Sequence, residues 1–207
     1  MLHWIVIPFR GPDGAKSRLA DALDERQRCA LAMAMFQRVL GVACAVNGAN
    51  RVLVVTTSSK AAEAAQKCGA TALREQAGAL NPALRNARAA LLLFGATRTT
   101  VLAADLPDVT EADVKAALSA EPGRIVIAPD RHGLGTNAVT LPLGVDFAFA
   151  FGPDSFVAHS NEAARHGLGV VRLDRPGLAN DLDTADDLAL LADGHWLQAI
   201  IAQPRAA

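Results

Sequence analysis

Three aspartates occupy positions from which their carboxylates could hold a divalent cation. Asp105 directly follows the run 100–104, which is typical of a parallel strand, and ligands of open α/β folds bind at the carboxyl ends of such strands. Asp181 and Asp183 flank Leu182, and residues two apart in an extended segment point the same way. Such acids suit Mg²⁺, which prefers oxygen ligands. The alternative is that the later two only precede and cap a helix.

A glycine-containing loop after the first apolar run carries three cations. Arg10, Lys16 and Arg18 lie in this loop together with Gly11 and Gly14, so backbone N–H groups and cationic side chains could together hold a triphosphate. The spacing matches neither the Walker motif nor the dinucleotide-binding fingerprint, which disfavours an ATPase or an NAD dehydrogenase. A solvated basic loop is the alternative.

A third polar group surrounds an expected helix start in the run Phe151–Phe156. Gly152 lets backbone come close to a ligand, Ser155 begins a helix whose N-terminus attracts anions, and His159 follows one turn later on the same face. Thr136 adds a short polar side chain. These residues predict a binding site for a phosphate or a carboxylate. The alternative is an ordinary helix start at which one of these side chains only caps the helix.

The elements that must position these residues are short β-branched runs that alternate with Ala- and Leu-rich helical runs, which favours parallel strands with crossover helices. The expected fold class is therefore α/β. Strands are expected at residues 4–8, 52–57, 100–104, 125–128, 135–141, 147–151 and 169–173. Helices are expected from a cap at Asp24 through Val46, at 60–67, from a cap at Asn81 through Phe94, after a cap at Thr110, at 155–166, and from a cap at Thr184 to Gly194.

Length and composition indicate one domain. The 207 residues are 51% hydrophobic and 20% charged, which is enough apolar material for a sizeable core. Residues 1–130 are expected to form a nucleotide-binding half. Residues 131–207 are less regular and are expected to close over it.

Charge and targeting signals exclude several classes of partner. A formal net charge of −1 disfavours a nucleic acid or an anionic membrane as partner. The uninterrupted apolar stretches fall short of the roughly 18 to 20 residues that span a bilayer, and the first residues lack a signal peptide, so a cytoplasmic location is predicted. The three cysteines stand in no Cys-x-x-Cys spacing, which favours reduced thiols over disulfides or zinc.

Together the motifs resemble the 2-phospholactate guanylyltransferase family, which acts in the biosynthesis of the deazaflavin coenzyme F-420. The resemblance covers nearly the whole chain, and the late Asp-x-Asp-Thr combined with Phe-Gly-Pro-Asp-Ser-Phe makes it specific. Its motifs are, in order, Ile7-Pro8-Phe9-Arg10, Ala15-Lys16-Ser17-Arg18-Leu19-Ala20, Leu80-Asn81-Pro82-Ala83-Leu84, Asp105-Leu106-Pro107, Gly135-Thr136-Asn137-Ala138, Phe151 to Phe156 with His159, and Asp181-Leu182-Asp183-Thr184.

The resemblance implies a single-domain nucleotidyltransferase fold similar to the GT-A glycosyltransferases: a Rossmann-like, three-layer α/β/α unit with a mostly parallel sheet. It implies that GMP passes from GTP to the phosphate of a three-carbon acid, with release of pyrophosphate. That acid is 2-phospho-L-lactate, phosphoenolpyruvate or 3-phospho-D-glycerate. The product would pass to the transferase that builds the deazaflavin coenzyme, and the enzyme would be a monomer or a homodimer.

The resemblance also implies a role for each matching residue. Asp105, Asp181 and Asp183 would be Mg²⁺ ligands, with Asp105, Asp183, Lys16 and Arg18 forming the catalytic set. Pro8, Lys16, Arg18 and Asn81 would bind the nucleotide. Arg10, Thr136, Gly152, Ser155 and His159 would bind the acceptor, although Arg10 stands where many members have Lys, which could change the shape of the acceptor pocket.

Two other readings stay open. One is a nucleotidyltransferase of the molybdenum-cofactor type, which shares the fold. Its loop after the first strand reads Leu-Ala-Gly-Gly-x-Ser-x-Arg, however, whereas this chain has Arg-Gly-Pro-Asp-Gly-Ala-Lys-Ser-Arg there. The other is a non-catalytic nucleotide-binding module. The presence of all three aspartates argues against that second reading.

Overall fold

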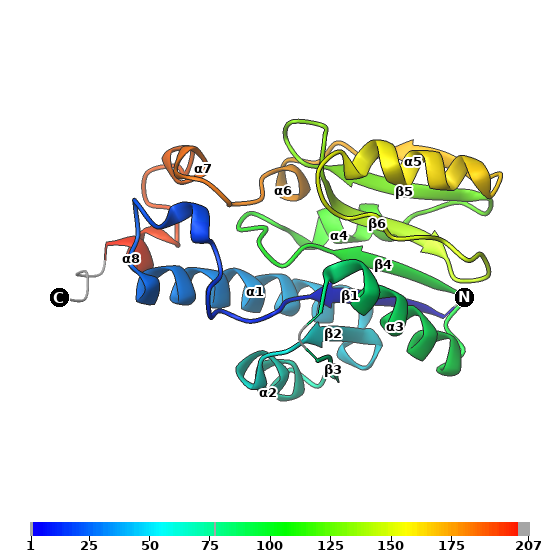
Figure 1. The fold of residues 1–207 in the computed structure, drawn as a ribbon, viewed down its shortest axis with the longest axis horizontal. Helices are drawn as coiled ribbons and strands as arrows, with labels where there is room; N and C mark the ends of the chain where they lie inside the picture. The colour runs from blue at the N-terminus through cyan, green and yellow to red at the C-terminus, as the bar shows by residue number, and fades with distance from the viewer. Residues whose placement is uncertain (1, 77, 203–207) are drawn as a thin grey trace.

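Seven strands among the described residues hydrogen-bond into one sheet in the order β3-β2-β1-β4-β6-β5-β7 (Figure 1). The computed structural model describes residues 2–76 and 78–202. Only β6 runs antiparallel to its neighbours, β4 and β5, so the sheet is mostly parallel, as predicted. The strands are β1 (His3–Pro8), β2 (Val52–Thr56), β3 (Thr71–Arg74), β4 (Arg98–Leu102), β5 (Arg124–Pro129), β6 (Thr136–Pro142) and β7 (Gly169–Arg172).

Helices cover both faces of the sheet, which confirms the three-layer α/β/α prediction. Core residues of α1, α2 and α4 pack on one face, and those of α3 and α5 pack on the other. The α-helices are α1 (Glu25–Asn47), α2 (Ser59–Lys67), α3 (Leu80–Leu93), α4 (Glu111–Leu118), α5 (Ser155–Arg165), α6 (Pro176–Ala179), α7 (Ala185–Ala189) and α8 (Gln198–Ile201). Two short 3-10 turns, η1 (Ser17–Leu19) and η2 (Ala49–Arg51), complete the elements.

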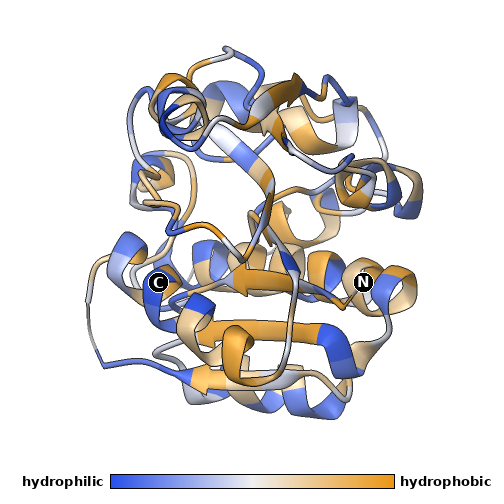
Figure 2. Cartoon of the chain, turned by 90° about the vertical axis from the view of Figure 1, so that its right-hand side faces the viewer, coloured by the Kyte–Doolittle hydropathy of each residue, from blue (hydrophilic) through white to orange (hydrophobic). Residues whose placement is uncertain are grey.

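Alternation along the central strand explains the layering. Ile5 and Ile7 belong to the core beneath α1, whereas Trp4 and Val6 belong to the core beneath α3. All four are nearly inaccessible to solvent, and Figure 2 shows the strands as mainly apolar bands between the helices. A strand with two buried faces needs a continuous apolar run, and the first run of the chain supplies it.

Local capping signals fixed the starts of three helices as predicted. Reciprocal capping boxes begin α1 at Asp24, α4 at Thr110 and α7 at Thr184. In each box the cap side chain accepts from the backbone three residues later, and that later side chain accepts from the cap backbone, which satisfies two otherwise unpaired donors.

The expected strand at 147–151 is wrong. The segment is extended but has no strand neighbour, because side chains accept from its backbone instead. Ala148 N donates to Glu162, Ala150 N to His159 and Phe151 N to the Asn81 side chain. Side-chain acceptors of this kind leave no signal in the segment's own sequence.

Two helix boundaries differ from the sequence prediction, and three short elements were not predicted. Asn81 does not cap α3: the cap position is Ala79, and the Asn81 amide is used on the 147–151 segment. The last predicted helix ends at Ala189 rather than near Gly194. Strand β3 and the short helices α6 and α8 were not predicted, and all three are only four residues long, which is too short to show a hydrophobic period.

The second half of the chain extends the sheet of the first half rather than closing over it. Strand β5, from the first half, lies between β6 and β7, from the second. The boundary near residue 130 therefore separates two hydrogen-bonded neighbours in the sheet.

Helix α1 is long and apolar enough to cross a membrane by length and composition alone. A core helix passes the same test, and α1 contacts β1, β2 and α4. Its residues Phe36, Val39 and Leu40 are completely buried against the sheet, which accounts for its apolar character within the fold.

Candidate functional site

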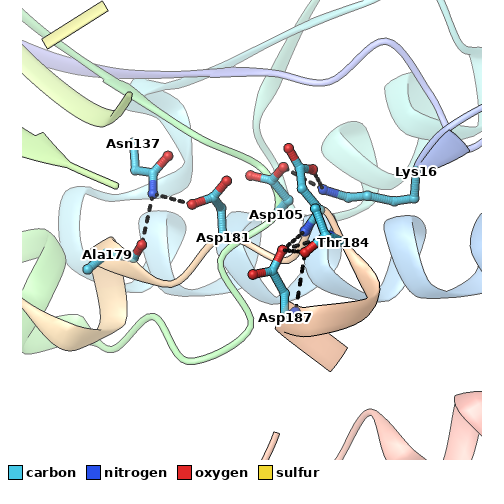
Figure 3. A network of polar contacts seen from close by, with 8 residues as sticks. Lys16, Asp105, Asn137, Ala179, Asp181, Thr184 and Asp187 are labelled. Carbon is cyan, nitrogen blue, oxygen red and sulfur yellow. Dashed lines mark hydrogen bonds and ion pairs between the residues drawn. The ribbon is translucent and has the colours of Figure 1, made fainter. Parts of the chain in front are cut away.

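The centre of the site is the Lys16 ammonium, which lies between two carboxylates. Lys16 Nζ is 2.6 Å from Asp105 Oδ2 and 2.6 Å from Asp183 Oδ1, and Figure 3 shows this network. The Lys16 side chain is only 8% exposed, whereas the two aspartate side chains are 30% and 42% exposed. The carboxylates thus remain open to solvent on the side away from the lysine.

The loop after β1 brings Lys16 to this place through a short apolar anchor. Lys16 has φ 54° and precedes η1, where Leu19 is buried. Leu19 packs in a small cluster with Leu31 of α1 and Leu182. The same cluster therefore fixes both the lysine loop and the segment that carries the later aspartates.

Asp181 and Asp183 face the site while Leu182, between them, points into that cluster, as expected for an extended segment. The Leu182 backbone N donates to the Asp105 carbonyl at 3.2 Å, which holds the segment against the end of β4. Asp181 Oδ1 accepts from Asn137 Nδ2 at 3.0 Å, and in Figure 3 Asp105 lies between Asp181 and Lys16.

Burial and the neighbouring charges of the site shift the pKa values of Asp181 and Lys16. Burial raises the pKa of Asp181, as do the nearby Asp105 and Asp183 carboxylates, while the Asn137 hydrogen bond opposes the rise. Burial lowers the pKa of Lys16, but Asp105 and Asp183 outweigh it, so the pKa is raised overall. Asp105 and Asp183 pair with the one ammonium while the Asp181 carboxylate lies nearby, and this excess of negative charge attracts a further cation.

Asp187 holds the backbone around Asp183. Its Oδ2 accepts from the backbone N of Asp183 at 2.8 Å and of Thr184 at 2.7 Å, and its Oδ1 pairs with Arg131 at 2.6 Å. These bonds lower the pKa of Asp187 although burial opposes them. Asp187 is also the residue at position N3 of the capping box that begins at Thr184, whereas no local pattern in the sequence indicates the role of Arg131.

A second polar group lies at the start of β6 and α5. Thr136 Oγ1 is 3.1 Å from His159 Nδ1, and Ser155 begins α5 one turn before His159. The Phe156 backbone N donates to the Leu134 carbonyl at 2.9 Å, which joins the two starts. Gly152, with φ +142°, adopts a backbone conformation that other residues rarely take.

His159 differs from its predicted role as a direct contact to the acceptor. The residue is fully buried, and both ring nitrogens already have partners, Thr136 Oγ1 and Ala150 N. Its ring therefore reaches the site only through Thr136. Asn137, the residue next to Thr136, donates to Asp181 instead, so the start of β6 connects the two groups.

Three other predicted residues lie at the end of β1 and in the loop and turn that follow it. Pro8 ends β1, and the Arg10 guanidinium donates to the Gly78 carbonyl at 2.6 Å. Arg10 thus contacts the connection between β3 and α3 rather than the start of β6. Arg18 is exposed on η1, and the structure gives it no hydrogen bond or ion pair with another described residue.

Asn81 lies at the start of α3 and joins that helix to the extended segment 147–151. Its Nδ2 donates to the Phe151 carbonyl at 3.1 Å, and its Oδ1 accepts from the Phe151 N at 2.8 Å. This paired bond fixes the backbone that leads into Gly152. The sequence placed Asn81 near the nucleoside, and no local pattern indicated the bond to residue 151.

The donor set fits a hard divalent cation. Carboxylate oxygens of Asp105 and Asp183 converge on one point, now filled by the Lys16 ammonium, and oxygen ligands are what Mg²⁺ takes. Within residues 2–76 and 78–202, no three His, Cys, Asp or Glu side chains form a ready-made metal cluster. A metal between these two aspartates therefore requires the lysine to move.

Comparison with known proteins adds independent information. The family described as guanylyl transferase CofC like matches residues 3–195. Phosphoenolpyruvate guanylyltransferase of Rubrobacter xylanophilus is 41% identical over 200 residues, which cover 96% of this chain and 97% of the relative. The enzyme of the same name from Sphaerobacter thermophilus is 38% identical, covering 92% of each chain.

Solved structures support the fold. A structure from Desulfovibrio desulfuricans G20, whose name assigns it to the nucleotide-diphospho-sugar transferases, has a TM-score of 0.73 at 17% identity, covering 96% of this chain and 93% of that one. A cytidylyltransferase from Leptospira borgpetersenii has a TM-score of 0.58 at 14% identity, covering 97% and 92%. At such identities the likeness concerns the fold, which is that of nucleotidyltransferases.

Proposed function

Because the chain belongs to the guanylyl transferase CofC like family, we propose that it transfers GMP from GTP to phosphoenolpyruvate and releases pyrophosphate. Guanylyl transfer is the activity in the family's name. Phosphoenolpyruvate is the acceptor in the names of its relatives at 41% and 38% identity. The observation that carries the proposal is the convergence of Asp105 and Asp183 on Lys16 at the carboxyl end of β4.

The reaction needs positioned charge rather than a proton carrier. An acceptor phosphate is largely ionised at neutral pH, so one of its oxygens can attack the α-phosphorus of GTP directly. The bond from that phosphorus to the oxygen bridging the β-phosphorus breaks, and pyrophosphate leaves. The step involves no proton transfer, which agrees with a site built from carboxylates and cations.

Mg²⁺ is the proposed cofactor, with Asp105, Asp181 and Asp183 as its ligands. When bound, the ion would neutralise the negative charge that gathers on the phosphates. Asn137 would orient Asp181 by its hydrogen bond, and Asp187 would orient Asp183 through the backbone. Lys16, released from the carboxylates, would then be free to hold the phosphates of the leaving group.

The remaining residues are assigned to binding of the nucleotide or of the acceptor. Pro8, Lys16, Arg18 and Asn81 are proposed to bind the nucleotide, and Arg10 to bind the acceptor, as the family resemblance implies. Thr136, Gly152 and Ser155 are proposed to seat the acceptor. Ser155 is 2% exposed, and its hydroxyl has no hydrogen-bond partner among the residues described, so it is available to a ligand.

The wider role is also a proposal. The product, a guanosine diphosphate ester of the acid, would pass to the transferase that builds the deazaflavin coenzyme F-420, in the cytoplasm. The three acceptors named for the family differ by a hydroxyl group, a double bond or the position of the phosphate. A site that hydrogen-bonds one of them closely can reject the others.

The test is pyrophosphate release from GTP and Mg²⁺ with phosphoenolpyruvate, 2-phospho-L-lactate or 3-phospho-D-glycerate, each supplied in turn. ATP and CTP serve as nucleotide controls, and the transferase that consumes the product is included in case the product is labile. We expect release with GTP and phosphoenolpyruvate. Release with another acid alone would correct the acceptor, and no release with any acid would overturn the proposal.

A further inference from the structure

The hydrogen bonds around His159 fix which of its nitrogens carries the proton. The backbone N of Ala150 donates to Nε2 at 3.1 Å, so Nε2 must be an unprotonated acceptor. A neutral imidazole with an accepting Nε2 has its proton on Nδ1. Burial lowers the pKa of His159 to about 4, although Glu162 opposes this, and the ring is therefore neutral near pH 7.

This tautomer decides what the Thr136 hydroxyl can do. Nδ1–H points at Thr136 Oγ1, 3.1 Å away, so that oxygen accepts from the histidine. A hydroxyl has one donor hydrogen, and within the described part of the chain nothing accepts the hydrogen of Thr136. The residue is 7% exposed, and a buried hydroxyl hydrogen without an acceptor is costly unless a ligand supplies one.

We propose that His159 is a positioning residue that keeps the Thr136 hydroxyl as a donor toward an anionic oxygen of the acceptor. The inference rests on the proposed function, because it takes Thr136 to face the phospho-acid. The order of donation runs from Ala150 N to His159, from His159 to Thr136, and from Thr136 to a carboxylate or phosphate oxygen. With the other tautomer the Thr136 hydrogen would turn back to Nδ1, and lone pairs would meet the anion.

A purely structural role for His159 is the competing explanation. Its Nε2 also holds the extended segment 147–151, together with Glu162 one turn further along α5. The two roles use different nitrogens of the ring. Substitutions that keep one nitrogen's function and lose the other's can therefore separate them.

The paired variants are His159→Asn and His159→Gln. The Asn amide nitrogen lies where Nδ1 lies and can still donate to Thr136, but it loses the acceptor for Ala150. The longer Gln amide reaches the Nε2 position and can accept from Ala150, but it leaves Thr136 without a donor. Each variant is compared with wild type in KM for phosphoenolpyruvate, KM for GTP, kcat and thermal unfolding.

We expect His159→Gln to raise the acceptor KM by roughly fivefold or more, because the Thr136 hydroxyl loses the neutral donor that fixes the direction of its own hydrogen, with KM for GTP unchanged. We expect His159→Asn to stay within about threefold of wild type in acceptor KM, even though it unfolds at a lower temperature. Against a Thr136→Val background the two substitutions should no longer differ in acceptor KM. Equal acceptor KM values for the two single variants would overturn the proposal.

Nitrogen-15 NMR of the ligand-free wild-type protein tests the tautomer without any activity. Long-range correlations should show His159 protonated at Nδ1 and not at Nε2 near pH 7. A proton on Nε2 overturns the inference whether or not the variants fold. If the wild-type protein turns over no acceptor, the proposed function fails, and the NMR result still decides the tautomer.

Discussion

Acidification should destabilise the protein through His159. In the folded state burial lowers the pKa of this histidine from 6.5 to about 4, whereas in the unfolded chain it returns to about 6.5. Between these values the unfolded state binds more protons, so the free energy of unfolding falls as the pH falls. The histidine's contribution is fully present above pH 6.5 and is lost progressively toward pH 4.

The size of the effect follows from the two pKa values. Between pH 7.5 and pH 5, one group shifted in this way removes about 2 kcal/mol of stability. Glu162 is the charged group that opposes the shift, and its effect is contained in the value of about 4. His3, whose pKa is also lowered to about 4, first by burial and then by Arg98 and Arg51, adds a similar amount. Both together are a large share of the 5–15 kcal/mol typical of a folded domain.

The assay is urea unfolding at pH 7.5 and pH 5, for wild type and for His159→Asn. The variant should be less stable at pH 7.5, but its stability should fall by about 2 kcal/mol less than that of wild type between the two pH values. Since the variant keeps His3 and every carboxylate, the difference isolates His159. An equal fall in both proteins would refute the reasoning, because it would mean that His159 titrates normally in the fold.

Three further predictions concern the carboxylate cluster. Asp183→Asn should abolish turnover while leaving far-UV circular dichroism unchanged, and wild-type rates in that variant would contradict the metal assignment. Lys16→Met removes the ammonium from between Asp105 and Asp183, so it should destabilise the metal-free protein by about 1–3 kcal/mol. This loss is smaller than that of a fully buried ion pair because both aspartate side chains are partly exposed. Urea unfolding with and without MgCl₂ should then show a larger metal stabilisation than in wild type, and an identical one would argue against a shared site. Asp187→Asn should lower kcat and weaken Mg²⁺ binding in a titration, because Asp187 orients the Asp183 backbone and pairs with Arg131; unchanged metal affinity would count against that role.

Most strands and long helices could be predicted because their signals are local. The apolar run at β1 and the capping boxes at Asp24, Thr110 and Thr184 each act within a few residues. The family resemblance supplied the nucleotidyltransferase fold and guanylyl transfer, which the comparisons support. The assignments of individual residues to metal, nucleotide and acceptor remain predictions.

Two of the wrong predictions share one physical cause. The segment 147–151 has the composition of a strand, but its hydrogen-bond partners are side chains of Glu162, His159 and Asn81. Asn81 is of a residue type that favours helix caps, but its amide pairs with the Phe151 backbone. In both cases hydrogen bonds to residues distant in the sequence override the local structural preference. A pattern of neighbouring residues cannot reveal such partners.

The sequence by itself determined which chemical groups are available and that strand ends would carry them. It placed Asp105 after a strand and Asp181 and Asp183 around an apolar residue, and those local features persist in the fold. Only the tertiary structure decided that Lys16 lies between Asp105, 89 residues away, and Asp183, 167 residues away. Contacts of that separation form when the whole sheet and the Leu182 cluster are packed, because no local interaction can repay the entropy of closing such loops.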